Sequence, residues 1–349
     1  MDSDNNEKTY YMPAEWTPHQ RTLTAFPELP GTYGDAVSLE VARLEVAAIA
    51  NAIAQCEPVW LYCTAQSIEQ AKTLVSENVT IKEAAVDNLW IRDLGPVFVR
   101  ESGNGSKGSA AIDFNFNYWG NKVEPTVDPS FARRMLGLSD FNGVARHVAD
   151  IVSEGGALEV DGEGTLLVTD SSVVNPNRNP GVSREAIERE LKRVLGVIEV
   201  VWLKGVMGLE STDWHVDAFA RFVGPGRVVL SRPPTNAHSK LHEVYDAALE
   251  TLANARDAKG RKFEVHSCQE PDQETLPKGH VEGMVTSYVN YLLVNGGLIM
   301  AKFGQLDTDD AAKKQLGELF PGRRIVQVEI NELPKLGGGI HCATQQVPQ

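Results

Sequence analysis

Three polar residues recur at an even interval along this chain. Asp93, Glu154 and His215 lie 61 positions apart. Each follows an apolar segment that is typical of a β-strand and stands before or within a predicted hairpin. Cys342 comes 127 positions after His215, about twice the same interval. The chain is therefore interpreted as about five copies of one helix-and-sheet unit, whose loops converge on one point.

A repeat of about 60 residues favours a closed radial array over two separate domains. His280 and Glu282 lie near the position at which a fourth copy of the polar residue is expected. In a closed array the terminal units have to meet, and the N-terminal strand then completes the last blade. Although 349 residues are enough for two ordinary domains, we predict a single α/β domain over 1–349, in which 1–10 form a flexible arm.

Apolar periodicity predicts the elements of these units. Helices are expected over 38–54, 68–75, 183–195, 238–253 and 309–319, with Ser183 as an N-cap. Single strands are expected over 22–26, 59–63, 144–148, 197–203, 263–267 and 325–330. Hairpins are expected to join 97–100 with 110–114, 157–160 with 165–168, 219–223 with 228–231, and 288–294 with 298–303.

The segment 337–346 reads Gly-Gly-Gly-Ile-His-Cys-Ala-Thr-Gln-Gln and precedes a three-residue tail. Glycines permit a close approach of the backbone, and a thiol follows them at once. Cys342 is therefore a candidate nucleophile, although a buried structural thiol after a glycine turn is the plain alternative. His341 is the obvious neighbouring base, but the phase of the repeats assigns that role to His215 and leaves His341 a packing or orienting residue.

The residues that share the repeat phase fit one kind of chemistry. A cysteine thiolate attacks electron-poor carbon, and a histidine can protonate the leaving group and later deprotonate water. Asp217 would share the face of His215 in an extended segment. Two carboxylates can hold a guanidinium by charge-assisted hydrogen bonds, and Trp90 and Trp214 could stack on that planar cation. Taken singly, Asp93 could pair with an arginine, and His215 could be an ordinary core histidine.

Charge and composition limit the classes of molecule that this protein is expected to bind. The net charge of −14 argues against nucleic acid and suits a cationic small molecule, although it also serves solubility. Apolar runs are too short for a membrane span, and 1–8 have no signal-peptide pattern, so we expect a cytoplasmic protein. The four cysteines lack Cys-x-x-Cys spacing. No ligand pair has clustered zinc spacing, so no metal is expected.

Motifs along nearly the whole chain are similar to those of one family. They are 12–16 (Met-Pro-Ala-Glu-Trp), 90–96, 154–156 with 161–167, 175–180, 215–217, 287–290 and the closing 337–346. The chain resembles the agmatine deiminases, in the family that also holds the bacterial-type peptidyl-arginine deiminases. The resemblance implies a five-bladed α/β propeller of the pentein type, with pseudo-fivefold ββαβ-type repeats. It also implies a hydrolase that converts a guanidine to a ureido group and ammonia, without a cofactor.

The resemblance also assigns roles. Cys342 is implied as the nucleophile, His215 as the general acid and base, and Asp93 and Asp217 as the carboxylates that hold the guanidinium. The resemblance also places Trp90 in the pocket, and the other residues expected to bind substrate are Glu154, Trp214, Ser211 and Gly339. The bound cation should itself lower the pKa of the cysteine.

Three positions depart from the family pattern. Relatives that act on agmatine usually carry an acidic residue where this chain has Ser211. Trp214 stands where the family often has a small or acidic residue, and Phe26 stands where the family has a tryptophan before a proline. The changes fall where the far end of the substrate would lie, so the substrate is either agmatine, with Glu210 in place of the missing acid, or an arginine-derived guanidine with a neutral or peptidic tail.

Other functions stay open on the sequence alone. An amidinotransferase would use the same residues with an amine as acceptor. A thiol peptidase would use Cys342, His215 and an aspartate. A guanidine-binding protein without catalysis is the non-enzymatic alternative. The protein could also form a homodimer.

Overall fold

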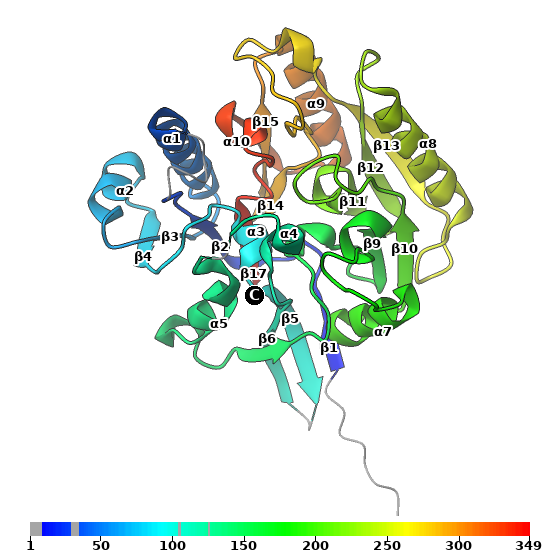
Figure 1. The fold of residues 1–349 in the computed structure, drawn as a ribbon, viewed down its shortest axis with the longest axis horizontal. Helices are drawn as coiled ribbons and strands as arrows, with labels where there is room; N and C mark the ends of the chain where they lie inside the picture. The colour runs from blue at the N-terminus through cyan, green and yellow to red at the C-terminus, as the bar shows by residue number, and fades with distance from the viewer. Residues whose placement is uncertain (1–8, 29–34, 104–105, 125) are drawn as a thin grey trace, which may run out of the picture.

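The strands of this protein form five separate sheets around a common centre (Figure 1). The structure is a computed structural model that describes residues 9–28, 35–103, 106–124 and 126–349. The short helices α3 (Ile91–Leu94) and α4 (Tyr118–Asn121) lie near that centre, and the longer helices lie outside. The five predicted repeat units are therefore confirmed, as a pentein-type α/β fold.

The sheets follow the chain around the ring. The first contains β17 (Thr344–Pro348), β2 (His19–Ala25), β3 (Val59–Cys63) and β4 (Val79–Glu83); the second contains β1 (Thr9–Tyr11), β5 (Val97–Gly103), β6 (Ser106–Asp113) and β7 (Ala145–Val148). The third contains β10 (Glu199–Leu203), β9 (Thr165–Thr169) and β8 (Glu159–Val160). The fourth contains β11 (Ala220–Gly224), β12 (Arg227–Arg232) and β13 (Glu264–Gln269), and the fifth β14 (Leu292–Val294), β15 (Gly297–Lys302) and β16 (Arg324–Glu329).

The remaining elements connect these sheets. The α-helices are α1 (Ala36–Ile53), α2 (Ile68–Leu74), α5 (Phe131–Leu136), α6 (Asp170–Val173), α7 (Arg184–Leu195), α8 (Ser239–Asn254), α9 (Leu306–Leu319) and α10 (Glu332–Lys335), besides α3 and α4. Short 3₁₀ turns are η2 (Asp128–Ser130), η3 (Ser139–Phe141), η4 (Gly155–Ala157), η5 (Val216–Ala218) and η6 (Gln273–Thr275). Ser183 caps α7 as predicted, since its side chain accepts a hydrogen bond from the Ala186 amide.

Every sheet repeats the same pairing rule. An antiparallel pair is followed by a parallel strand in β5-β6-β7, β8-β9-β10, β11-β12-β13 and β14-β15-β16. In the first sheet the antiparallel partner of β2 is β17, from the other end of the chain. The predicted meeting of the terminal units is thus confirmed, because the two ends of the chain together make the hairpin that every other unit makes alone.

Most boundaries differ from the sequence expectation by a few residues, and two of the differences have a clear physical cause. The arm expected over 1–10 is already a strand at Thr9, because β1 pairs with β5 and the Met12 amide donates to the Leu195 carbonyl. Residues 1–8 lie outside the described part. The hairpin strand expected from 288 begins only at Leu292. Residues 288–291 are buried but do not pair as a strand. The Tyr288 hydroxyl there donates a hydrogen bond to Asp309.

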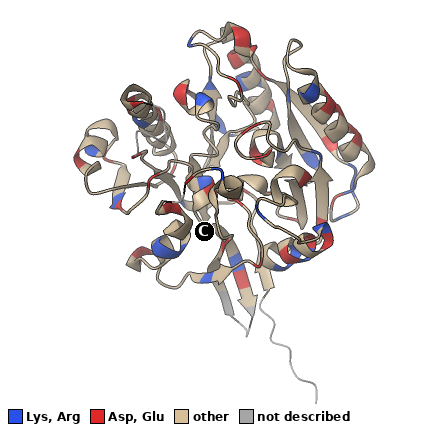
Figure 2. Ribbon diagram, viewed as in Figure 1, with Lys and Arg blue, Asp and Glu red and all other residues tan. Residues whose placement is uncertain are grey.

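The outer helices carry charges of both signs. Figure 2 shows acidic and basic residues mixed along α7 and α8, on the rim of the ring. Among the described residues, no helix is both long enough and apolar enough to cross a membrane. Buried charged residues lie both on outer helices, such as Glu190 on α7, and in the loops of the units, such as Glu154.

Candidate active site

Loops from different units bring the predicted residues together at the centre. Asp93 lies on α3, Glu154 directly precedes η4, His215 and Asp217 flank the start of η5, and Cys342 precedes β17. The distance from His215 Nδ1 to Asp93 Oδ1 is 3.7 Å, and that from Cys342 Sγ to Asp217 Oδ2 is 3.5 Å. All five residues are buried. The interval of 61 positions therefore does mark loops that converge.

Gly156 defines the point on which the polar atoms converge. A Cβ atom built on it would lie 2.5 Å from His215 Nδ1, 2.9 Å from Asp93 Oδ1 and 3.1 Å from Asp217 Oδ2. Three groups from two different units, Asp93 from one and His215 with Asp217 from another, thus surround one small volume. Only a residue without a side chain leaves this volume open.

His215 is held between two carboxylates. Its Nε2 atom lies 3.3 Å from Glu154 Oε2, and Asp93 faces its Nδ1 atom. Burial opposes protonation of the ring, but the Asp93 charge and the contact with Glu154 outweigh it and raise the pKa of His215 to about 9. At neutral pH His215 is therefore an imidazolium, ready to act as an acid.

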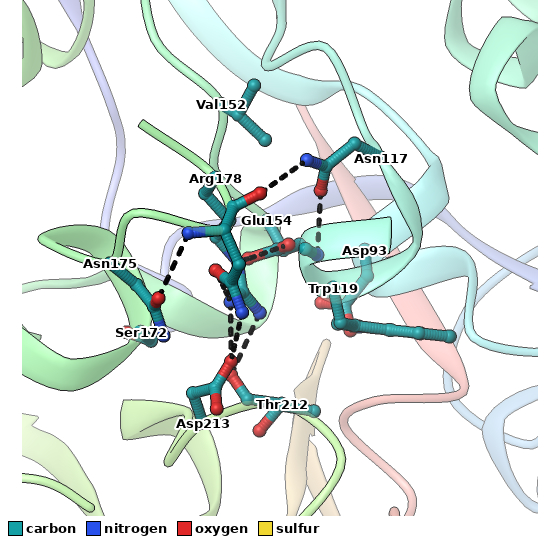
Figure 3. A network of polar contacts seen from close by, with 12 residues as sticks. Asp93, Asn117, Trp119, Val152, Glu154, Ser172, Asn175, Arg178, Thr212 and Asp213 are labelled. Carbon is teal, nitrogen blue, oxygen red and sulfur yellow. Dashed lines mark hydrogen bonds and ion pairs between the residues drawn. The ribbon is translucent and has the colours of Figure 1, made fainter. Parts of the chain in front are cut away.

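Arg178 supports this histidine from behind. Its Nε atom donates to Glu154 Oε1 at 2.7 Å, and its two terminal nitrogens donate to Asp213 Oδ2 at 2.8 Å and the Thr212 carbonyl at 2.9 Å. Figure 3 shows Arg178 between Glu154 and the loop of Thr212 and Asp213. Glu154, which was expected to bind substrate, thus has both oxygens occupied, by Arg178 and His215, and this geometry is that of an orienting group.

Asp93 has a partner that the sequence analysis missed. The indole nitrogen of Trp119 donates to Asp93 Oδ2 at 2.8 Å, and the Gly156 amide donates to Oδ1 at 3.0 Å (Figure 3 shows the tryptophan beside the aspartate). Trp119 has φ 54°, and its neighbour Tyr118 has φ 57°. Such backbone strain is characteristic of functional loops. Burial raises the pKa of Asp93 to about 6, although the His215 charge acts in the opposite direction.

The thiol of Cys342 lies in a negative environment. Asn290 Nδ2 donates to its Sγ atom at 3.2 Å. Burial, together with the charges of Asp217 and Asp93, raises the pKa of Cys342 well above its ordinary value. The resting thiol is therefore protonated, and a positive charge that enters beside it would favour the thiolate.

His341 braces Asp217 and does not face the reaction centre. Its Nδ1 atom lies 2.7 Å from Asp217 Oδ2, and its Nε2 atom lies 2.7 Å from Glu15 Oε2. Arg221 in turn donates to Glu15 at 2.8 Å. Burial opposes ionisation of Asp217, but the contact with His341 outweighs it and lowers the pKa of Asp217. These contacts bear out the orienting role expected for His341.

The three glycines of the closing segment each pack against one side chain: Gly337 against Ser211, Gly338 against Trp90 and Gly339 against Asn290. Cβ atoms built on them would approach those side chains to 2.8, 2.5 and 2.6 Å respectively. The close approach predicted for the glycines is confirmed. It also places Trp90 and Ser211 against the backbone that carries Cys342.

A cavity of about 420 Å³ leads from Cys342 toward the surface. His215, Asp217 and Trp214 line its inner part, whereas Trp90, Ser211 and Gly339 are not among the described residues that line it. The carboxylates on its wall, besides Asp217, are Glu210, Glu270, Asp272, Glu274 and Glu282. No lysine or arginine is among these described lining residues. His280 and Glu282, noted for their repeat phase, lie exposed on the outer wall.

Three buried polar atoms of residues that line the cavity have no hydrogen-bond partner in the described structure, and besides Trp214 Nε1 they are the two at the reaction centre. His215 Nδ1 and Asp217 Oδ1 make no hydrogen bond within the described structure. A buried polar atom without a partner is costly, and in an active site it marks a place where a ligand completes the set. A thiol, a charged histidine and two carboxylates can together bind a guanidinium and exchange one of its nitrogens. Within the described residues, no three His, Cys, Asp or Glu side chains are arranged to hold a metal ion.

Comparisons with known proteins give one consistent result. The profile of a family described as Porphyromonas-type peptidyl-arginine deiminase matches residues 11–348. Agmatine deiminase of Stutzerimonas stutzeri (strain A1501) is 36% identical and covers 100% of this chain and 98% of its own length. Agmatine deiminase of Ectopseudomonas mendocina (strain ymp) is also 36% identical, and the match covers 97% of this chain and 95% of that protein. The solved agmatine deiminase of Enterococcus faecalis superposes with a TM-score of 0.86 at 30% identity, and the match covers 98% of this chain and 96% of that chain.

Proposed function

Because this chain belongs to the family of Porphyromonas-type peptidyl-arginine deiminases and is a guanidine deiminase, a hydrolase of C–N bonds, we propose that it acts on agmatine. The whole chain acts as one catalytic domain. The products are ammonia and the ureido compound that corresponds to agmatine.

One observation carries the choice of agmatine. The described wall of the cavity has six acidic residues and no lysine or arginine. Agmatine carries a positive charge at both ends and suits such a wall throughout its length. Free arginine carries a carboxylate, which would find like charges there, and such juxtapositions cost several kcal/mol. The arginine-derived alternative is therefore the weaker one.

We propose that the guanidinium occupies the space in front of Gly156. There Asp93 and the unpaired Asp217 Oδ1 atom would accept its N–H groups, and His215 Nδ1 would face one nitrogen. The incoming cation lowers the pKa of Cys342, and the thiol proton is lost to solvent.

The reaction then proceeds in two steps. Cys342 Sγ bonds to the guanidinium carbon, a C–N bond breaks, and the His215 imidazolium gives its proton to the departing nitrogen, which leaves as ammonia. A water molecule then gives a proton to the neutral His215 while its oxygen bonds to the same carbon. The C–S bond breaks and the hydroxyl proton of the new ureido group passes to solvent, so the thiolate and the imidazolium are restored and the neutral ureido product is free.

The substrate choice is tested with a panel of guanidines. Agmatine, arginine, N-acyl arginine and arginine dipeptides are assayed for ureido product and for ammonia. We expect kcat/KM for agmatine to exceed that for arginine about 10²-fold, because the acidic wall disfavours a carboxylate. A preference for a peptide or for arginine would overturn the choice of agmatine and leave the deiminase reaction standing.

The charge states of the site predict the pH dependence of the reaction. Asp93 must be ionised to hold the guanidinium, so activity should fall below pH 6, near its pKa of about 6. His215 must be protonated to release ammonia, so activity should fall above pH 9, near its pKa of about 9. The lower limb is measured as kcat/KM and the upper limb as kcat for n-pentylguanidine, whose guanidinium stays charged over this range. The upper limb uses kcat because the bound cation has then already lowered the pKa of Cys342, whose free thiol is still protonated at pH 9. Activity that still rises above pH 9 would contradict an acid role for His215.

A further inference from the structure

Glu270 is a partly buried carboxylate of the cavity that has no cationic partner among the described residues. Glu270 directly follows β13 and lines the cavity that contains Cys342. Its Oε1 atom accepts a hydrogen bond from the Ser231 hydroxyl at 2.7 Å, and the Thr286 hydroxyl is its other side-chain donor. No lysine, arginine or histidine of the described residues forms an ion pair with it. Burial raises the pKa of Glu270 to about 7.

Short contacts connect Glu270 with the reaction centre. The Ser231 hydroxyl, which donates to Glu270, lies 2.8 Å from the Ser287 hydroxyl. The Ser287 carbonyl accepts the Asn290 amide, and the side chain of Asn290 donates to Cys342 Sγ at 3.2 Å. On the other side, the Ser231 amide donates to the carbonyl of Phe219, a lining residue that closely follows Asp217. Glu270 therefore faces the same cavity as the nucleophile, farther along its wall.

The other carboxylates of the wall are occupied or open to solvent. Glu210, the expected substitute for the acid missing at position 211, accepts the amide and hydroxyl of Thr212 and the amide of Trp214, so both of its oxygens hold its own loop. Asp272 accepts the Glu274 amide and the Asn236 side chain. Glu274 and Glu282 are exposed, and exposed charges contribute little to binding.

We propose that Glu270 is the specificity-determining residue that binds the terminal ammonium group of agmatine. The inference rests on the proposed function. A carboxylate removed from water without a counter-ion is unfavourable, and the substrate's ammonium supplies that counter-ion. The charge-assisted hydrogen bond fixes the far end of the substrate while the guanidinium lies at Gly156. The Ser231 and Thr286 hydroxyls orient the carboxylate, and because they are neutral donors they do not cancel its negative charge.

The test compares Glu270→Gln with the natural protein on two substrates. Agmatine ends in an ammonium group, and n-pentylguanidine has a methyl group in its place. We expect Glu270→Gln to lower kcat/KM about 30-fold for agmatine and less than about threefold for n-pentylguanidine, because the amide keeps the shape and loses the charge. Glu274→Gln, an exposed acid on the same wall, is the matched control and should change neither value more than about twofold.

Stability separates this role from a structural one. The melting temperature of Glu270→Gln should not fall, because the substitution removes a partly buried charge that has no cationic partner. An equal loss on both substrates, or no loss on agmatine, would overturn the proposal for Glu270 while the deiminase function stands. If the natural protein turns over n-pentylguanidine as well as agmatine, no residue selects the ammonium group. If it acts on neither guanidine, the proposed function itself fails.

Discussion

Replacing Cys342 with alanine is expected to abolish the release of ammonia and ureido product, with a fall in kcat of at least about 10³-fold. The structure places Sγ 3.5 Å from Asp217 Oδ2 and 3.2 Å from Asn290 Nδ2, at the inner end of the cavity. Without a nucleophile the S-linked amidino intermediate cannot form, and neither His215 nor the carboxylates can substitute for it. The measurement is single-turnover formation of ureido product from agmatine.

Cys268 provides the matched control. It is also a buried thiol, on β13, and burial raises its pKa to about 12. It does not line the cavity among the described residues, so Cys268→Ala should keep its activity. A haloacetamidine should modify Cys342 and leave Cys268 unmodified. Undiminished turnover by Cys342→Ala would contradict the assigned nucleophile.

Three further assays on the natural protein separate the related chemistries. An amidinotransferase would form a new guanidine when glycine or another amine is supplied. A thiol peptidase would cleave peptides that lack a guanidine. A binding protein without catalysis would hold agmatine and leave Cys342 unmodified by the haloacetamidine. The unpaired Asp217 Oδ1 atom and the acidic wall favour a cationic guanidine over a neutral peptide.

Periodicity predicted the parts of the fold that repeat. The pairing rule recurs in every sheet, so equal spacing in the sequence became equivalent placement around the centre. Asp93, Glu154 and His215 could be assigned to one point for this reason. The pairing of β17 with β2 followed from closure, because a ring of such units has no free edge at the junction.

Residues that contribute through local geometry could not be found in the same way. Trp119 reaches Asp93 through a stretch of left-handed backbone that no apolar pattern predicts. Asn290 lay within a recognised motif, but its contact with Cys342 depends on where the strand begins. Glu270 has no repeat phase at all. Its importance becomes visible only from the shape of the cavity and from the partners of the other acids.

Replacing Gly156 with alanine is expected to lower kcat/KM on the order of 10³-fold, although the substitution adds a single methyl group to a residue that performs no chemistry. A displacement of about 1 Å in an active site can cost 10²-fold, and here one Cβ atom would displace three catalytic groups at once. It would lie 2.5 Å from His215 Nδ1 and within 3.1 Å of both carboxylates. The same atom would occupy the space proposed for the guanidinium.

Gly108 supplies the comparison for this substitution. It lies exposed in β6, and a Cβ atom built there has nothing within 4 Å, so Gly108→Ala should leave kcat/KM unchanged. For Gly156→Ala we expect the loss for n-pentylguanidine to equal that for agmatine, because the guanidinium end is affected and the tail is not. This is the reverse of the pattern expected for Glu270→Gln. If Gly156→Ala discriminated between the two substrates, the guanidinium could not lie at Gly156, and the two ends of the substrate would have to be exchanged.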